Sequence, residues 1–207
     1  LAMELNFLFV DTGALYRAIG LLLHDQKIEF AEGEKLDKAL AKIKLRYGVS
    51  DSCLIKGNGK DLTREIRKHH VSKLASQVAK LPRVRQYLLS TQRQLAKERI
   101  CVMEGRDIGT VIFPKAFCKI FFTASIDVRT ERRLSQLRET GESSLDFNQI
   151  KKDIEERDHA DYTRKEAPLK QADDAILLDT SNMAREKVLE EMKKIVISQA
   201  ENKGIKL

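Results

Sequence analysis

The sequence predicts an α/β protein in which a parallel sheet is flanked by helices. The first observation is that short apolar, β-branched runs alternate with stretches of helical periodicity in the outer parts of the 207-residue chain. The second is that 42% hydrophobic and 33% charged residues suit a globular core, while no apolar run approaches the roughly 20 residues that span a bilayer. We therefore expect one domain with embellishments, or two small domains.

The chain opens with a predicted strand at residues 6–10, which ends at Asp11. A helix follows, and Thr12 is its expected N-cap because hydroxyl side chains accept from free amides at helix starts. A second amphipathic helix is expected over residues 33–43. These elements form the first strand and helices of the predicted α/β layer.

The composition changes between residues 44 and 63, where short strand-like pieces are separated by Ser, Asp, Gly and Asn. The pieces lie at residues 45–48, 53–56 and 60–63. The sequence Gly57-Asn58-Gly59 is typical of a hairpin turn, so a small antiparallel sheet is expected here. Helices then return over residues 64–80 and 83–98, with Pro82 suited to the first turn of the second helix.

The second half of the chain returns to alternating strands and helices. We expect strands at 100–104, 117–123 and 175–179 and helices at 126–139, 146–160 and 183–202. Ser125 is the expected cap of the first of these helices, and Asp146 with Gln149 resembles a capping box for the second. Residues 141–145 form a polar break between the two helices.

The formal net charge of +7 predicts attraction to nucleic acid, anionic lipid or small phosphorylated substrates. Because aromatic residues are sparse and Trp is absent, stacking on single-stranded bases is disfavoured and small anions are favoured. Cys53, Cys101 and Cys118 lack metal-ligand spacing and are expected to be reduced core residues of a cytosolic protein. No secretory signal is apparent at the start of the sequence.

The stretch Glu104-Gly105-Arg106-Asp107-Ile108-Gly109-Thr110 directly follows the apolar run at 100–103, and its first residue ends the predicted strand. Open α/β sheets bind ligands just beyond the ends of such strands. Arg106 offers a planar fork of donors for phosphate, and Asp107 can accept from an amino group or hold water around a metal. The alternative is a strand-end turn with a surface ion pair.

Two predicted helices carry basic residues at helical spacing, and together they could form a clamp. The two sets are Arg129, Arg132 and Arg133 on one helix, and Arg157, Asp161 and Arg164 on one face of the next helix if that helix persists beyond residue 160. Three neighbouring positive charges repel unless an anion lies between them, so a mobile clamp could close on polyphosphate. The alternative is a pair of solvated basic faces. Ser76, Gln77 and Arg85 flank Pro82 and, taken alone, would be surface residues.

With these motifs in order, the chain resembles bacterial-type cytidylate kinases, which phosphorylate CMP and dCMP with ATP. The matching segments lie in the family's order over almost the whole chain. They are Asp11 to Arg17, Ala75 to Val78 with Pro82 to Arg85, Gly105 to Thr110, and Glu156 to Asp158 continuing through Asp161 and Arg164 to Leu169.

The resemblance implies a P-loop nucleoside monophosphate kinase fold with three parts. These are a core at 1–37, 99–125 and 167–207, a nucleoside-monophosphate-binding insert with the small sheet at 38–98, and a helical lid at 126–166. The family's Gly-rich phosphate loop would lie before Leu1, so the residues that hold the ATP phosphates are unknown. A chain without that loop is expected to be inactive.

The resemblance also implies a role for each matching residue. Cytosine would be recognised by Ser76, Arg85 and Asp107, with Thr12 beside them, and the ribose would be held by Arg157 and Asp161. The monophosphate would be bound by Arg17, Arg106 and Arg164, while the transferring phosphoryl group would be approached by Arg129 and Arg133, so that Arg129, Arg133 and Arg164 form the catalytic set. Glu104 stands where Asp is common in the family and would organise water around Mg2+.

These expectations describe a cytoplasmic monomer that uses CMP, dCMP and ATP in pyrimidine nucleotide metabolism, with no nucleic-acid or membrane partner. Two alternatives stay open on the sequence. One is a kinase that prefers UMP or AMP, and the other is a non-enzymatic nucleic-acid-binding protein that uses the basic lid.

Overall fold

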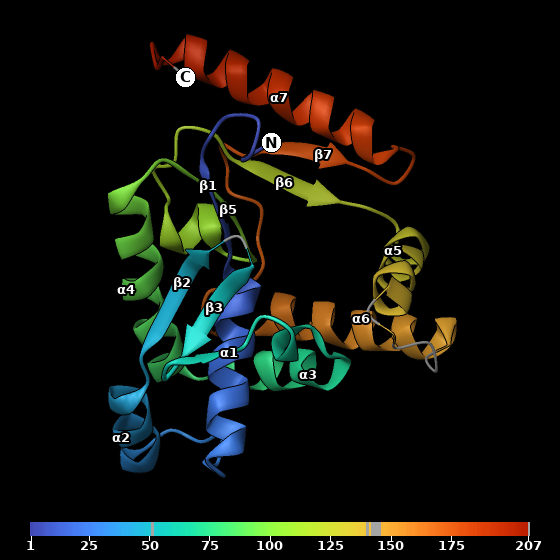
Figure 1. Cartoon of the computed structure of the whole chain (residues 1–207). Coiled ribbons are helices and arrows are strands. Elements are labelled where there is room, and N and C mark those ends of the chain that lie inside the picture. The colour runs from blue at the N-terminus through green and yellow to red at the C-terminus, as the bar shows by residue number, and fades with distance from the viewer. Residues whose placement is uncertain (51, 140, 142–145, 207) are drawn as a thin grey trace. The chain divides into compact units, whose positions relative to one another are not determined.

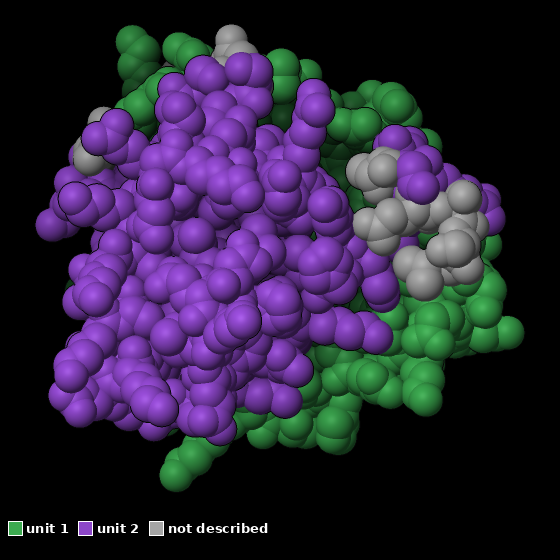
Figure 2. Space-filling model, turned by 60° about the horizontal axis from the view of Figure 1, so that its bottom comes forward, with its two compact units in different colours: residues 1–10, 99–136, 145–207 green, residues 11–98, 137–144 purple. Residues whose placement is uncertain are grey.

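The computed structural model describes residues 1–206 apart from 51, 140 and 142–145. Most of the polar break expected at 141–145 therefore lies outside the described residues. The chain divides into two compact units, which Figure 2 shows in different colours. Unit 1 comprises Leu1–Val10, Arg99–Gln136 and Leu145–Leu207, and unit 2 comprises Asp11–Glu98 and Leu137–Ser144.

Unit 2 contains the small sheet and the helices around it. Its elements are α1 (Thr12–Asp25), α2 (Glu34–Lys42), β2 (Leu45–Ser50), β3 (Cys53–Gly57), β4 (Lys60–Asp61), the 3-10 turn η1 (Glu65–Arg67), α3 (His69–Val78) and α4 (Pro82–Glu98). The strands are antiparallel in the order β2-β3-β4, and β3 lies beside α1 (Figure 1). Asn58 and Gly59, both with positive φ, form the turn between β3 and β4. The expected hairpin and small sheet are confirmed.

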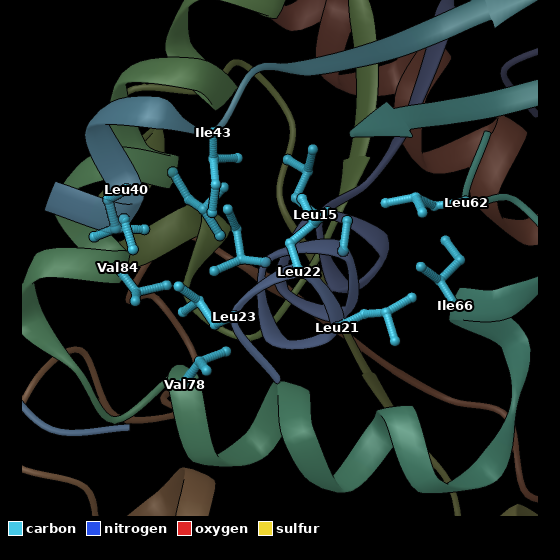
Figure 3. Packing of buried hydrophobic residues seen from close by; sticks show 14 of the residues in the cluster. Leu15, Leu21, Leu22, Leu23, Leu40, Ile43, Leu62, Ile66, Val78 and Val84 are labelled. Carbon is cyan, nitrogen blue, oxygen red and sulfur yellow. The ribbon is translucent and has the colours of Figure 1, made fainter. Parts of the chain in front are cut away.

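The core of unit 2 is built on the apolar face of α1. Leu15, Ile19 and Leu23 are fully buried, and Figure 3 shows Leu15, Leu22 and Leu23 among side chains from α2, α3 and α4. Burying one such side chain contributes about 1.5–3 kcal/mol to folding. Gly20 permits close packing of α1 on α3, because an added Cβ would lie 3.1 Å from the Leu74 backbone carbon.

Unit 1 contains two pairs of strands and three long helices. Its elements are β1 (Leu8–Asp11), β5 (Cys101–Glu104), the π-helical turn η2 (Ile108–Ile112), β6 (Ile120–Thr123), α5 (Ile126–Glu139), α6 (Phe147–Thr163), β7 (Ile176–Asp179) and α7 (Arg185–Asn202). β1 pairs with β5, and β6 runs parallel to β7 with Ile120 opposite Ile176 (Figure 1). Parallel strands with intervening helices confirm the predicted α/β class.

Side-chain caps fix the starts of three helices. Asp11, and not the expected Thr12, caps α1, since its Oδ1 accepts from Ala14 N at 2.9 Å. Asp146 caps α6 by accepting from Gln149 N at 2.9 Å. The Gln149 side chain donates to Asp153 at 3.2 Å, so only the Asp146 half of the expected capping box is observed. Ser125 Oγ accepts from Val128 N at 3.4 Å before α5, as expected.

Two of the differences from the sequence prediction have a local cause. The single helix expected over 64–80 is wrong, because Lys68 is extended (φ −62°, ψ 144°) and separates η1 from α3. The strand expected from 117 begins only at Ile120, since the Phe117 carbonyl accepts from Lys203 Nζ instead of a neighbouring strand.

Among the described residues, no helix combines the length and apolar character needed to cross a membrane.

The hairpin glycine Gly57 is required by close packing. A Cβ at this position would lie 2.7 Å from Cδ1 of both Leu22 and Leu62, and both leucines are buried. We expect Gly57→Ala to lower the free energy of unfolding by about 1–3 kcal/mol, because the core has no room for the methyl group. Urea denaturation would measure the loss. Lys60→Ala, an exposed change on the same hairpin, is the control, and an equal effect of the two changes would contradict this packing argument.

Candidate functional site

The stretch that follows β5 forms a strand-end turn, as the sequence predicted. Glu104 is exposed at the end of the strand, whereas Asp107 is buried, with 6% of its surface accessible. The Asp107 carbonyl accepts from Val111 N at 2.9 Å and Ile112 N at 3.2 Å, which winds the next residues into η2. β5 and η2 hold the backbone on both sides of Asp107. The Cα from which its carboxylate projects is therefore fixed in position.

Lys119 packs against this turn. Its side chain is only 7% exposed, and Nζ donates to Asp174 Oδ1 at 2.7 Å. The bond from Lys119 holds the pKa of the Asp174 carboxyl below its usual value, so this carboxyl stays ionised near neutral pH. Gly109 lies against the Lys119 stem, since an added Cβ would be 3.1 Å from Cδ. Sequence reasoning did not single out Lys119, although a lysine inside an apolar run was a usable signal.

Asp161 on α6 is the carboxylate around which three arginines gather. Arg106 Nε donates to Oδ2 at 3.1 Å, and Arg164 Nη1 donates to Oδ1 at 3.3 Å. Arg157 Nε lies 3.9 Å from Oδ2. The Asp161 side chain is 12% exposed and Arg106 is 42% exposed, so a largely buried anion holds a guanidinium that solvent can reach. We call Arg106, Arg157, Asp161 and Arg164 the Asp161 cluster.

Arg164 joins the cluster from beyond the end of α6. The sequence placed it on the same helical face as Arg157, but α6 ends at Thr163 and Arg164 is its extended C-cap. The Arg164 Nε–H donates to the Ala167 carbonyl at 2.7 Å, and Leu169 N donates to the Asp161 carbonyl at 2.8 Å. The chain therefore turns back at the end of the helix, and the backbone carbonyl of Ala167 in this turn holds the Arg164 side chain.

The arginines of α5 have partners of their own. Arg129 Nη1 donates to Asp158 on α6 at 2.5 Å, and Arg129 Nε donates to the Ala124 carbonyl at 3.0 Å. Arg132 donates to the hydroxyl and the carbonyl of Thr180. An anion between the three α5 arginines is therefore not needed to satisfy Arg129 or Arg132, which corrects that part of the sequence argument. Arg133 is half-buried on the same helix.

The remaining predicted site residues lie in unit 2. Thr12 is buried in the first turn of α1, and Arg17 in the next turn donates from Nη2 to Asp11 Oδ2 at 2.7 Å. Ser76 lies in the last turn of α3 and donates to the Ser72 carbonyl at 3.2 Å. Arg85 lies in the first turn of α4, with Nη1 3.4 Å from the Ala79 carbonyl. Each of these residues therefore lies in the first two turns or in the last turn of a helix of unit 2.

The described residues contain no group of three His, Cys, Asp or Glu side chains suited to a metal ion. Glu104 is an exposed carboxylate at the end of β5, and one carboxylate that acts through water fits Mg2+, which keeps several waters and takes other ligands from substrate phosphates. Burial raises the pKa of the Cys101 and Cys118 thiols, so both stay protonated near neutral pH. Cys53 is buried, as expected of a core residue, whereas Cys101 and Cys118 are only half-buried, so the expectation that all three are core residues is wrong for these two.

An α/β fold with a strand-end turn and arginines gathered around a carboxylate defines an anion-binding protein of the phosphate-handling class. Comparison with known families makes the assignment specific, because the family model described as cytidylate kinase matches residues 1–198. The chain belongs to the cytidylate kinase family and has its P-loop nucleoside monophosphate kinase fold.

Individual relatives agree with the family match. The chain is 42% identical to the cytidylate kinase of Caldicellulosiruptor saccharolyticus, covering 93% of this chain and 85% of the relative. It is 39% identical to the cytidylate kinase of Listeria welshimeri, covering 98% and 88%. A bifunctional pantoate ligase/cytidylate kinase of Prochlorococcus marinus is 42% identical over 93% of this chain, which spans only 38% of that longer protein.

The Asp161 cluster predicts a specific stability effect. Asp161→Asn removes the negative charge shared by three arginines, one of which, Arg164, is 9% exposed. We expect the free energy of unfolding to fall by about 1–3 kcal/mol, because a charged group is left without its ionic partner. Added sulfate should recover part of the loss in the variant by replacing the missing anion.

The measurement is denaturant unfolding with and without sulfate. Glu155→Gln is the matched control, since Glu155 is an exposed carboxylate on the same helix. If Asp161→Asn and Glu155→Gln lose the same stability and respond equally to sulfate, the central role of Asp161 is refuted.

Proposed function

We propose that this protein transfers the γ-phosphoryl group of ATP to the 5′-phosphate of CMP and dCMP, which yields the diphosphates and ADP. The observation that carries the proposal is the Asp161 cluster in a chain whose family match covers residues 1–198. Three guanidiniums held in place by one carboxylate provide fixed donors for an anionic nucleotide.

The acceptor phosphate is assigned to Arg17, Arg106 and Arg164. Arg106 suits the role because its guanidinium is 42% exposed while its Nε is held by Asp161. A guanidinium has five N–H donors, so a phosphate can bind Arg106 through donors that Asp161 does not use. The geometry supports recognition of a phosphate without large rearrangement of the side chain.

Cytosine recognition is assigned to Asp107, Ser76 and Arg85, with Thr12 beside them. Cytosine presents an amino donor next to a ring acceptor, and a carboxylate with an arginine or hydroxyl partner complements that edge. The buried position of Asp107 supports this role, because a desolvated carboxylate discriminates strongly against a base that offers no donor. Asp107 is assigned to binding and not to proton abstraction, since the acceptor phosphate is already largely ionised near neutral pH.

The ribose is assigned to Arg157 and Asp161, and the transferring group to Arg129 and Arg133 with Arg164. Asp158 and the Ala124 carbonyl hold Nη1 and Nε of Arg129, and a phosphate oxygen can bind through the guanidinium donors that these two groups do not use. Transfer of this kind proceeds in line without a covalent enzyme intermediate, and catalysis comes from positioning and charge stabilisation.

Mg2+ is the expected metal, and Glu104 would hold it through water at the end of β5. When bound, Mg2+ would neutralise charge on the phosphates and orient them.

The proposal extends to a three-part organisation with a core at 1–37, 99–125 and 167–207, a nucleotide-binding insert at 38–98 and a lid at 126–166. It also extends to a cytoplasmic monomer in pyrimidine nucleotide metabolism. The contact-based units divide the chain differently, since α1 groups with the small sheet.

Substrate choice tests the proposal directly. The protein expressed from its complete coding sequence should release ADP from ATP and Mg2+ at least tenfold faster, as kcat/KM, with CMP or dCMP than with UMP or AMP. Asp107→Ala should reduce the preference for CMP over UMP, because the amino group of cytosine loses its acceptor. A wild-type rate no better with CMP than with AMP would refute the cytosine assignment, and unchanged CMP turnover in Asp107→Ala would refute the role of that residue.

A further inference from the structure

We propose that Asp11 is a positioning residue that aims Arg17 at the phosphate of the acceptor nucleotide. The proposal rests on the assignment of Arg17 to the CMP phosphate given above. It is carried by four observations at the first two turns of α1, all within unit 2. Together they describe a guanidinium that Asp11 fixes on one side and whose Nε–H has no acceptor among the described residues.

The first observation is that one carboxylate performs two tasks. Asp11 Oδ1 accepts from Ala14 N at 2.9 Å and so caps α1, while Oδ2 accepts from Arg17 Nη2 at 2.7 Å. The Asp11 side chain is 9% exposed, so the ion pair is poorly screened by solvent. The cap fixes the carboxylate relative to the helix, and the carboxylate then fixes the guanidinium.

The second observation concerns Gly13. A Cβ on this residue would lie 3.0 Å from Asp11 Oδ1 and 3.2 Å from Arg17 Nη1. The Asp11–Arg17 pair therefore lies directly across the Cα of Gly13. Glycine costs a helix about 0.5–1 kcal/mol relative to alanine, so its presence at the start of α1 agrees with a need for space beside the pair.

The third observation concerns the other donors of Arg17. The side chain is 16% exposed, and within the described part of the chain its buried Nε–H has no hydrogen-bond acceptor. A buried donor without a partner is costly, and such a group indicates a ligand that satisfies it. An anionic oxygen at this side of the guanidinium would do so.

The fourth observation ties the pair to the small sheet. Asp11 N donates to Tyr47 Oη at 2.7 Å, and Tyr47 lies on β2. The backbone of Asp11 is thus held by β2 while its side chain holds Arg17. A phosphate that binds Arg17 meets a guanidinium whose orientation is already set, which lowers the entropy lost on binding.

The competing account is that Asp11 only stabilises the helix. Asp11→Asn separates the two roles, because asparagine still caps a helix through its side-chain oxygen but provides no negative charge for Arg17. On the positioning account, Asp11→Asn raises KM for CMP about tenfold, the loss expected from one charge-assisted hydrogen bond. KM for ATP changes less than twofold, and the Kd of cytidine, which lacks the phosphate, is unchanged.

The experiment compares Asp11→Asn, Arg17→Met and the double variant, with denaturant unfolding recorded for each. Asp25→Asn is the matched control, since it makes the same change at the exposed far end of α1 and should leave every constant unchanged. If Asp11 acts through Arg17, the double variant should be no worse for CMP than Arg17→Met alone.

The outcomes separate the two proposals. If Arg17→Met raises KM for CMP but Asp11→Asn does not, or if Asp11→Asn weakens cytidine as much as CMP, the positioning role fails and the function stands. If Arg17→Met leaves KM for CMP unchanged, the phosphate assignment of Arg17 fails, and the positioning role fails with it.

Discussion

The Asp161 cluster depends on one electrostatic constraint: guanidiniums repel each other, and the negative charge of Asp161 offsets that repulsion. Without Asp161, the guanidiniums of Arg106 and Arg164 would repel each other, and the desolvated Arg164 would lose the ionic interaction that Asp161 provides. With it, residues from the strand-end turn and from the end of α6 are fixed in one cluster. On the proposed function, the site that binds the nucleotide is thereby organised before the nucleotide arrives.

The same device recurs on a smaller scale at the start of α1. Asp11 combines a helix cap with an ion pair to Arg17, whereas Asp161 shares its two oxygens among three arginines. In both places a short, buried carboxylate restricts a long and flexible arginine side chain, which otherwise loses up to about 2 kcal/mol of rotamer entropy when it binds. On the proposed function, this restriction would favour phosphate geometry over a general attraction for anions.

Periodicity and turn chemistry in the sequence were enough to predict the α/β class, the small sheet and most helices, because these features depend on residues close in the chain. Partner choice was harder to predict. Thr12 and Asp11 are both good caps, and only the structure shows that Asp11 reaches Ala14. Spacing placed Arg132 beside Arg129, yet Arg132 turns to Thr180, far along the chain. Similarly, helical spacing could not reveal that Arg106 would join Asp161 from another element.

The central claim is that Arg106 and Arg164, which Asp161 holds, receive the phosphate of the acceptor nucleotide. Nitrogen-detected NMR of the arginine Nε–H groups tests it most directly, since Arg106 Nε is the atom bonded to Asp161. CMP at saturation should shift the Arg106 Nε–H resonance, whereas cytidine at saturation should leave it in place, because cytidine lacks the phosphate. An Arg106 resonance that CMP leaves unmoved, or that cytidine moves equally, would contradict the claim.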